Sequence, residues 1–291
     1  MDEKTKHLLD IYFAQENNDV EKRIEHFELI TNSLFILTQS LFENKEKVKY
    51  HERELEGKFF RFGLANHSLI NLIKGNHFTL IDREVHIGDI FSINSITRMQ
   101  IESYLITFYL FFDQISDAEK DFRYDIYRLH GLQKQLRLKT PTEYPEKKEN
   151  LAKIELEINE VIQNIKNSNF YTTATENKKQ EYLKPRFAKL VRSEDLFKKG
   201  GIEDSRISKL WQLYSNHAHS EYISDRQYNT VYKIEKSFTD NHSIIILINS
   251  IMTSKIILNF KKQFISVEMK YSELSAGSKH HIEFWDTVKI K

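Results

Sequence analysis

The chain has 291 residues, with eight glycines, three prolines and no cysteine. Average usage of roughly 7% Gly and 5% Pro would supply about three times as many turn residues, which disfavours β-sandwiches, barrels and doubly wound α/β folds. The absence of cysteine excludes disulfides, thiolate metal sites and cysteine nucleophiles, and a net charge of +1 gives no bulk attraction to nucleic acid or membrane. We therefore expect an all-α fold, a multi-helix bundle with an inserted helical hairpin.

The first half of the chain contains four predicted helical segments. Apolar residues at three- and four-residue steps predict a shorter N-terminal helix and then a long amphipathic helix over 20–44. A further helix over 64–73 ends at a capping glycine, and 75–92 is expected to be a loop. The segment 95–112 is apolar nearly all round, which predicts a helix buried in the middle of the bundle.

The next segments indicate an insertion. A helix over 117–138 is closed by Pro141 and Pro145. Apolar residues from Leu151 to Ile165 then follow the 3-4-3-4 spacing of a short coiled coil, which we call the 151–165 seam. A return helix over about 180–199 would complete the hairpin. We therefore predict a bundle formed by 1–138 and 200–291, with an inserted arm over 139–199.

Two more long helices are expected after the arm, over 202–222 and 231–262. The tail 272–291 has no assigned role, although its apolar residues are expected to dock onto the core. The stretch 243–260 is interrupted by polar residues and is interpreted as a core helix rather than a membrane span. The N-terminus lacks the basic segment followed by an apolar segment that is typical of a signal peptide. We therefore expect a cytoplasmic protein that does not associate with a membrane and binds no cofactor.

Charge is distributed unevenly along the chain. Residues 1–30 are acidic, whereas 178–199 carry eight basic residues against three acidic ones, with aromatic residues interleaved. Such a stretch is able to contact phosphates and stack bases; the alternative is a solvated helix face whose aromatics point inward. The candidate RNA-binding residues are Lys178, Lys179, Lys184, Arg186, Lys189 and Arg192.

Arg98 and Glu102 are the conspicuous charges of the apolar segment 95–112, four residues apart on one helix face. Because a buried charge costs several kcal/mol unless it is paired, we expect them to pair with each other or with a neighbouring helix. Such a pair either fixes helix register or belongs to a functional site.

The segment 211–222 holds the second set of polar residues, His217, His219 and Glu221. On one continuous helix His219 would point about 200° away from His217, so the two would not share a metal. His217 and Glu221 have a spacing suited to a metal, but no third ligand is evident, and we predict no metal. The alternatives are acid–base catalysis and histidines that are simply hydrogen-bonded in the core.

Three segments, SITRMQIESYLITFYLFF, RYDIYRLHGL and LWQLYSNHAHSEY, resemble a family of uncharacterised bacterial all-helical proteins. That family is similar to the HEPN-type helical ribonucleases of toxin–antitoxin and abortive-infection systems. The resemblance implies RNA cleavage in stress or anti-phage defence. This sequence departs from the HEPN pattern of an arginine four to six residues before a histidine, because Arg206 lies eleven residues before His217.

Two hypotheses follow. The first is an RNA-binding or RNA-cleaving protein with Arg98, Glu102, His217, His219 and Glu221 as the candidate site, working without a metal. The second is a non-catalytic helical scaffold that self-associates or binds a partner protein through the 151–165 seam of a 141–199 hairpin.

Overall fold

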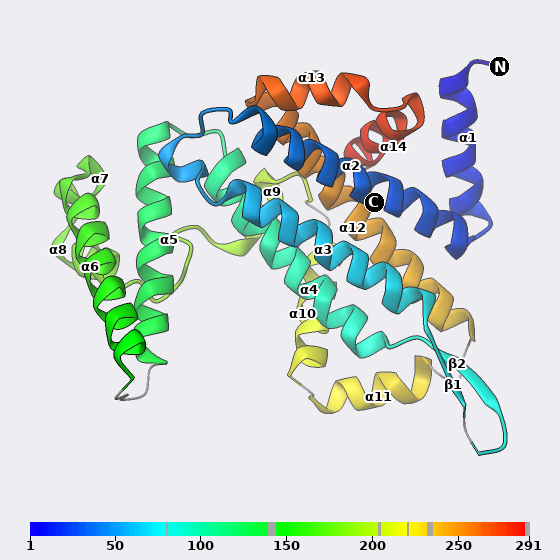
Figure 1. Cartoon of the computed structure of the whole chain (residues 1–291). Coiled ribbons are helices and arrows are strands. Elements are labelled where there is room, and N and C mark those ends of the chain that lie inside the picture. Colours follow the sequence, from blue (N-terminus) through cyan, green and yellow to red (C-terminus); the bar gives the residue numbers. More distant parts are fainter. Residues whose placement is uncertain (80, 139–143, 203–204, 220, 232–234, 289–291) are drawn as a thin grey trace. The chain divides into compact units, whose positions relative to one another are not determined.

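The computed structural model describes the chain except residues 80, 139–143, 203–204, 220, 232–234 and 289–291 (Figure 1). The described residues form fourteen α-helices, one 3₁₀ turn, one π-helical turn and a single two-stranded hairpin. The expected all-α multi-helix bundle is confirmed. Pro141, one of the two prolines predicted to close a helix, lies outside the described residues.

The elements of the first half are α1 (Glu3–Glu16), α2 (Val20–Asn44), η1 (Tyr50–Glu52), α3 (Leu55–Lys74), β1 (Asn76–Thr79), β2 (Glu84–Ile87), α4 (Ile90–Thr107), the π-helical η2 (Phe108–Phe112) and α5 (Asp117–Arg137). Those of the second half are α6 (Pro145–Asn167), α7 (Asn169–Thr172), α8 (Glu176–Leu183), α9 (Ser193–Lys199), α10 (Ser205–Ala218), α11 (Tyr222–Val231), α12 (Glu235–Gln263), α13 (Ile265–Glu273) and α14 (Ala276–Thr287).

The chain divides into two compact units. Unit 1 contains Met1–Val48, Glu54–Thr107 and Phe197–Lys291, and unit 2 contains Lys49–Arg53 and Phe108–Leu196. This division differs from the expected arm over 139–199, because α5 packs with α6 and therefore belongs with the arm.

Unit 1 is built around long helices with apolar faces. Phe27 of α2, Ile70 of α3, Ile93 of α4, Tyr214 of α10 and Ile245 of α12 belong to one buried cluster. Helix α12 packs against α2, α4 and α14. Its segment Asp240–Gln263 is, within the described part of the chain, the one stretch long and apolar enough to cross a membrane, and 72% of its most apolar window is buried. Length and composition alone do not distinguish a span from a core helix.

Unit 2 has its own core between α5, α6 and α8. Phe122, Ile126 and Leu129 of α5 are buried with Val161 and Ile165 of α6. The half-buried Tyr182 of α8 packs edge-on against Phe122, with 5.0 Å between ring centroids. Val161 and Ile165, the last two apolar residues of the 151–165 seam, are therefore buried against another helix of the same chain.

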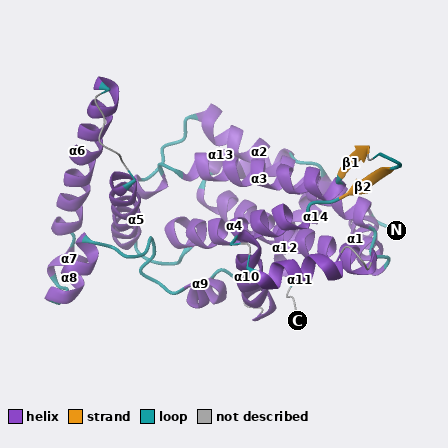
Figure 2. Cartoon of the chain, turned by 90° about the horizontal axis from the view of Figure 1, so that it is seen from below, coloured by secondary structure: helices purple, strands orange, loops and turns teal. Residues whose placement is uncertain are grey.

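Several local expectations are corrected by the structure. The segment 75–92 is not only a loop, since β1 and β2 pair antiparallel within it (Figure 2). The single return helix over 180–199 is wrong: α8 ends at Leu183, and an irregular segment separates it from α9. Pro185 explains this break, because proline disfavours helical conformation in the residue before it and removes a backbone donor.

The C-terminal tail docks onto unit 1 as expected. Residues Ala276–Thr287 form α14, where Ile282 and Trp285 are buried. Ser275 caps this helix by accepting a hydrogen bond from the backbone of Ser278. The tail therefore belongs to the folded core of unit 1 rather than extending from it.

Candidate functional site

His217 lies buried on the last turn of α10, at the junction with α4. Its Nε2 lies 2.5 Å from Oε1 of Gln227 on α11 and 3.4 Å from Nδ2 of Asn94 on α4. The ring of Phe91 packs against the imidazole at 5.3 Å between centroids. Three helices of unit 1 therefore hold this side chain in one orientation.

The protonation state of His217 follows from these contacts. Burial lowers the pKa of His217, and the hydrogen bond to the Gln227 side chain only partly opposes this effect. The imidazole is therefore neutral near pH 7. Because the Gln227 oxygen can only accept, Nε2–H donates to it, which places the lone pair on Nδ1. The Asn94 amide N–H can only donate, so at 3.4 Å from Nε2 it makes a packing contact and no hydrogen bond. That nitrogen is buried and has no hydrogen-bond partner among the described residues.

Arg98 and Glu102 form the ion pair expected from their spacing, with 3.0 Å between Arg98 Nη2 and Glu102 Oε1. The side chains are 24% and 42% exposed, so the expectation of a fully buried pair is wrong. Helix α4 packs against α3, α10 and α12 but leaves one face open. Arg98 follows Asn94 by one helical turn, which places it on α4 beside the His217 junction.

His219 and Glu221 do not join His217. Helix α10 ends at Ala218, and the backbone N–H of Glu221 donates to the carbonyl of Asn216, five residues back. The helical i, i+4 face expected for His217 and Glu221 is therefore not formed. Both His219 and Glu221 are exposed, and the Glu221 carbonyl instead accepts hydrogen bonds from the N–H and hydroxyl of Ser224.

Some of the buried polar atoms that have no hydrogen-bond partner belong to α4 and α10. Within the described residues they include Asn94 Oδ1, Arg98 Nε, Trp211 Nε1, Tyr214 OH and His217 Nδ1. Buried polar groups in folded proteins are nearly always hydrogen-bonded, so each exception requires an explanation. Hydrogen bonding within the described residues therefore leaves both donors and acceptors of α4 and α10 unsatisfied.

The six basic residues predicted to bind RNA belong to unit 2, whereas the residues just described belong to unit 1. Lys178, Lys184, Arg186 and Arg192 are exposed. Lys179 pairs with Glu176 at 2.8 Å, and Lys189 donates to the Ser193 hydroxyl at 2.9 Å.

The aromatic residues interleaved with these charges divide between two roles. Tyr182 packs within unit 2 and Phe197 is buried in unit 1. Phe187 is 72% exposed next to Arg186. One aromatic ring is therefore presented to solvent within the basic stretch.

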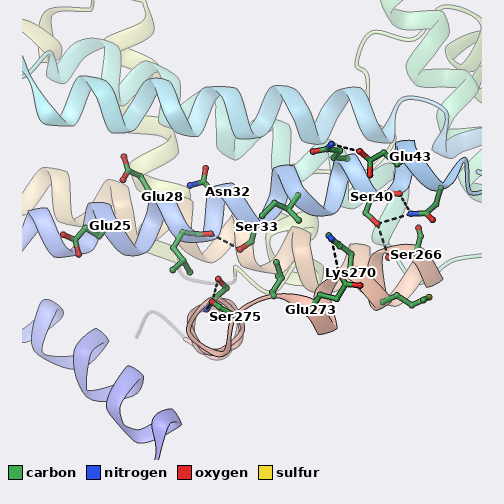
Figure 3. A pocket seen from close by; sticks show the side chains of 17 residues that line it. Glu25, Glu28, Asn32, Ser33, Ser40, Glu43, Ser266, Lys270, Glu273 and Ser275 are labelled. Atoms are coloured by element: carbon green, nitrogen blue, oxygen red, sulfur yellow. Dashed lines mark hydrogen bonds and ion pairs between the residues drawn. The ribbon is translucent and has the colours of Figure 1, made fainter.

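An elongated groove runs along α2 and is closed by α13 and the start of α14 (Figure 3). Its volume is about 980 Å³. Its labelled lining is mostly acidic and hydroxyl-bearing, and its glutamates are largely engaged: Lys74 contacts Glu28 at 2.6 Å and Lys270 contacts Glu273 at 2.8 Å. None of the residues predicted as catalytic lines this groove.

One group of side chains of the type that bind metal ions is not evident from the sequence. Asp10 of α1, His26 of α2 and His281 of α14 each offer one ligand atom, and these atoms lie within 4.8 Å of one another. His281 lies more than 250 residues after Asp10 and His26, and the three residues form no motif, so only the packing of α1, α2 and α14 reveals them.

Comparison of the chain with protein-family models, with curated proteins and with solved structures found no match. The function is therefore inferred from the geometry of these residues.

Proposed function

We propose that the chain binds RNA and cleaves it without a metal, with His217 transferring a proton and Arg98 neutralising phosphate charge at the α4–α10 junction. The observation that carries the proposal is the buried, neutral imidazole of His217. One of its nitrogens is engaged by Gln227, and the other carries a free lone pair. The resemblance to HEPN-type ribonucleases supports RNA as the substrate and bacterial defence as the setting.

The chemistry requires a base beside the ribose and a cation beside the phosphate. In the proposed reaction the α4–α10 junction opens to admit the ribose, because Nδ1 of His217 is buried in the closed state. His217 Nδ1 then takes the proton of a 2′-hydroxyl, the resulting oxyanion attacks the adjacent phosphorus, and the 5′-oxygen leaves with a proton from His219. The products are a 2′,3′-cyclic phosphate and a 5′-hydroxyl. The guanidinium of Arg98 stabilises the charge that develops on the phosphate oxygens. Its Nε is buried without a partner, while Nη2 is engaged by Glu102.

The roles of the two exposed residues follow from their positions. His219 is solvent-accessible directly after α10, where it is able to protonate a leaving group. Glu221 supports α11 through its carbonyl, so its side chain has no assigned task. In unit 2, Arg186 and Phe187 offer a charge and a stacking ring to single-stranded RNA.

The test is cleavage of a labelled single-stranded RNA by the purified full chain in the presence of EDTA, with the product ends identified as cyclic phosphate. Loss of a general base typically costs about 10²–10⁴-fold in rate, so His217→Ala should lose at least 100-fold. His67→Ala is the matched control, because His67 is a half-buried histidine of the same unit that stacks on Phe35.

Binding is measured separately. Phe187→Ala should weaken RNA affinity by about 5- to 100-fold, the range expected for one lost base–aromatic stack, while circular dichroism stays unchanged because this ring is exposed. Equal cleavage rates for the chain, His217→Ala and His219→Ala would refute the catalytic role. Unchanged affinity in Phe187→Ala would refute the contribution of the basic stretch through base stacking.

A further inference from the structure

The side chains of Asp10, His26 and His281 meet where α1, α2 and α14 pack together in unit 1. Asp10 Oδ2 lies 2.8 Å from His26 Nε2, and the rings of His26 and His281 lie 4.2 Å apart between centroids. His26 is 5% exposed and His281 is 3% exposed, whereas the Asp10 side chain is 42% exposed. The cluster therefore has two buried nitrogen ligands and one carboxylate open to solvent.

Two further histidines border this cluster. His7 of α1 lies 6.3 Å from His281 and 5.4 Å from His280 between ring centroids. Its ring also lies against Gly277, where an added Cβ would approach within 3.0 Å. The absence of a side chain at Gly277 lets α14 come this close to the histidine of α1. Four imidazoles are thus linked by ring contacts at this place, and two of them belong to the group that includes the Asp10 carboxylate.

Some of the histidine nitrogens at this place make no hydrogen bond to any described residue. Nδ1 of His26, Nδ1 of His280 and Nδ1 of His281 are all buried without a hydrogen-bond partner among the described residues. Burying polar atoms without partners costs about 1–3 kcal/mol each. Two of these atoms lie on rings only 4.2 Å apart whose side chains are more than nine-tenths buried, which indicates groups positioned for something other than core packing.

We infer that Asp10, His26 and His281 form a binding site for a divalent transition metal of the Zn²⁺ class. Two imidazoles and a carboxylate are a ligand set that zinc accepts in proteins, with a fourth position open to water or another side chain. Metal–ligand bonds of about 2.0–2.1 Å place tetrahedral ligand atoms about 3.3 Å apart. The candidate ligand atoms lie at most 4.8 Å from one another. Rotation of the side chains therefore has to shorten only the longest of these distances.

The consequence of metal binding follows from the position of the ligands. Residues 10 and 26 lie near the start of the chain and residue 281 lies near its end. A bound ion would fasten α14 to α1 and α2, and it would stabilise unit 1 because the unfolded chain holds no preformed site. This role is separate from RNA cleavage, which is proposed to need no metal.

The experiment uses the full chain without an affinity tag, because a polyhistidine tag itself binds zinc. After treatment with EDTA and dialysis, Zn²⁺ is titrated against a chromophoric chelator, and Co²⁺ binding is followed by its visible absorption. We expect one ion per chain and a higher melting temperature with Zn²⁺. Asp10→Asn and His281→Ala should weaken binding by more than the 10–100-fold typical of losing an outer-shell group.

Asp10→Asn is the decisive variant because the Asn oxygen still accepts the hydrogen bond from His26, so a failure to fold is not expected. His51→Ala is the matched control. His51 is fully buried and its Nδ1 lies 2.6 Å from Asp121, so this variant breaks a similar buried His–Asp pair in unit 2 and should retain the ion. The inference is overturned if the chain takes up no stoichiometric Zn²⁺, or if Asp10→Asn binds it as tightly as the unaltered chain.

Discussion

The buried ion pair of unit 2 allows a quantitative prediction. Arg123 of α5 donates to Asp113 at 2.7 Å, and both side chains are 5% exposed. The same guanidinium donates to Glu119 at 2.7 Å and lies 4.7 Å from the ring centroid of Tyr109. Replacing Arg123 by Met keeps much of the apolar volume but leaves the Asp113 carboxylate buried without its cation.

The expected cost of Arg123→Met follows from this geometry. Breaking a buried pair by removing one partner typically costs about 3–5 kcal/mol. With a urea m-value of about 2 kcal/mol/M, the midpoint of unfolding should fall by about 1.5–2.5 M. Replacing both partners, as in Arg123→Met with Asp113→Leu, should recover most of the loss, because no unpaired charge then remains buried.

Urea titrations read by circular dichroism and by tryptophan fluorescence measure this change. Both tryptophans, Trp211 and Trp285, lie in unit 1, so fluorescence reports that unit, whereas circular dichroism reports helices of both. Lys49→Met is the control: Lys49 pairs with Asp117 at 2.9 Å, but both side chains are 57% exposed, and such pairs contribute at most about 1 kcal/mol. A dichroism midpoint that falls no further for Arg123→Met than for this control would refute the reasoning.

Three other stability changes follow from single contacts. Burial raises the pKa of the Asp125 carboxyl from 3.8 to about 6. The folded chain therefore binds this proton more tightly, and the free energy of unfolding should fall by about 2 kcal/mol from pH 4 to pH 6.5; Asp125→Asn should remove this slope in urea titrations at the two pH values. Tyr104→Phe removes the hydrogen bond to the Gly200 carbonyl at 2.6 Å and should cost about 1–3 kcal/mol in the same assay. Ile165→Ala in the fully buried part of α6 should cost about 2–5 kcal/mol, whereas Leu156→Ala, at a position 70% exposed, should stay within about 0.5 kcal/mol in thermal unfolding.

Helix positions were predictable because their signals are local. The apolar spacing of α2 and the scarcity of glycine and proline act within a few residues, and the structure follows them. The return helix was mispredicted even though Pro185 carries a local signal against it. The prediction that His217 and Glu221 share a helix face is wrong for another reason. It requires α10 to continue to residue 221, whereas the helix ends at Ala218.

The candidate sites depend on contacts that no local pattern encodes. The imidazole of His217 packs against α4, where Asn94 lies 123 positions earlier in the chain. His281 meets Asp10 and His26 through the packing of helices from opposite ends of the sequence. Spacing along one helix identified the Arg98–Glu102 pair because both partners lie on that helix. The polar residues on apolar helices are therefore evident from the sequence, but the residues that they contact on other helices are evident only from the tertiary structure.

The two proposals concern unit 1 but rest on different helices, and one pair of measurements separates them. If His217 is the base, cleavage persists in EDTA and disappears in His217→Ala, while Asp10→Asn loses zinc and cleaves RNA normally. If instead EDTA and Asp10→Asn both abolish cleavage while His217→Ala cleaves normally, the reaction depends on the metal cluster, and the polar α4–α10 junction is structural. A neutral imidazole with a free lone pair serves equally as a proton acceptor and as a metal ligand, so the assignment of each histidine depends on the groups packed around it.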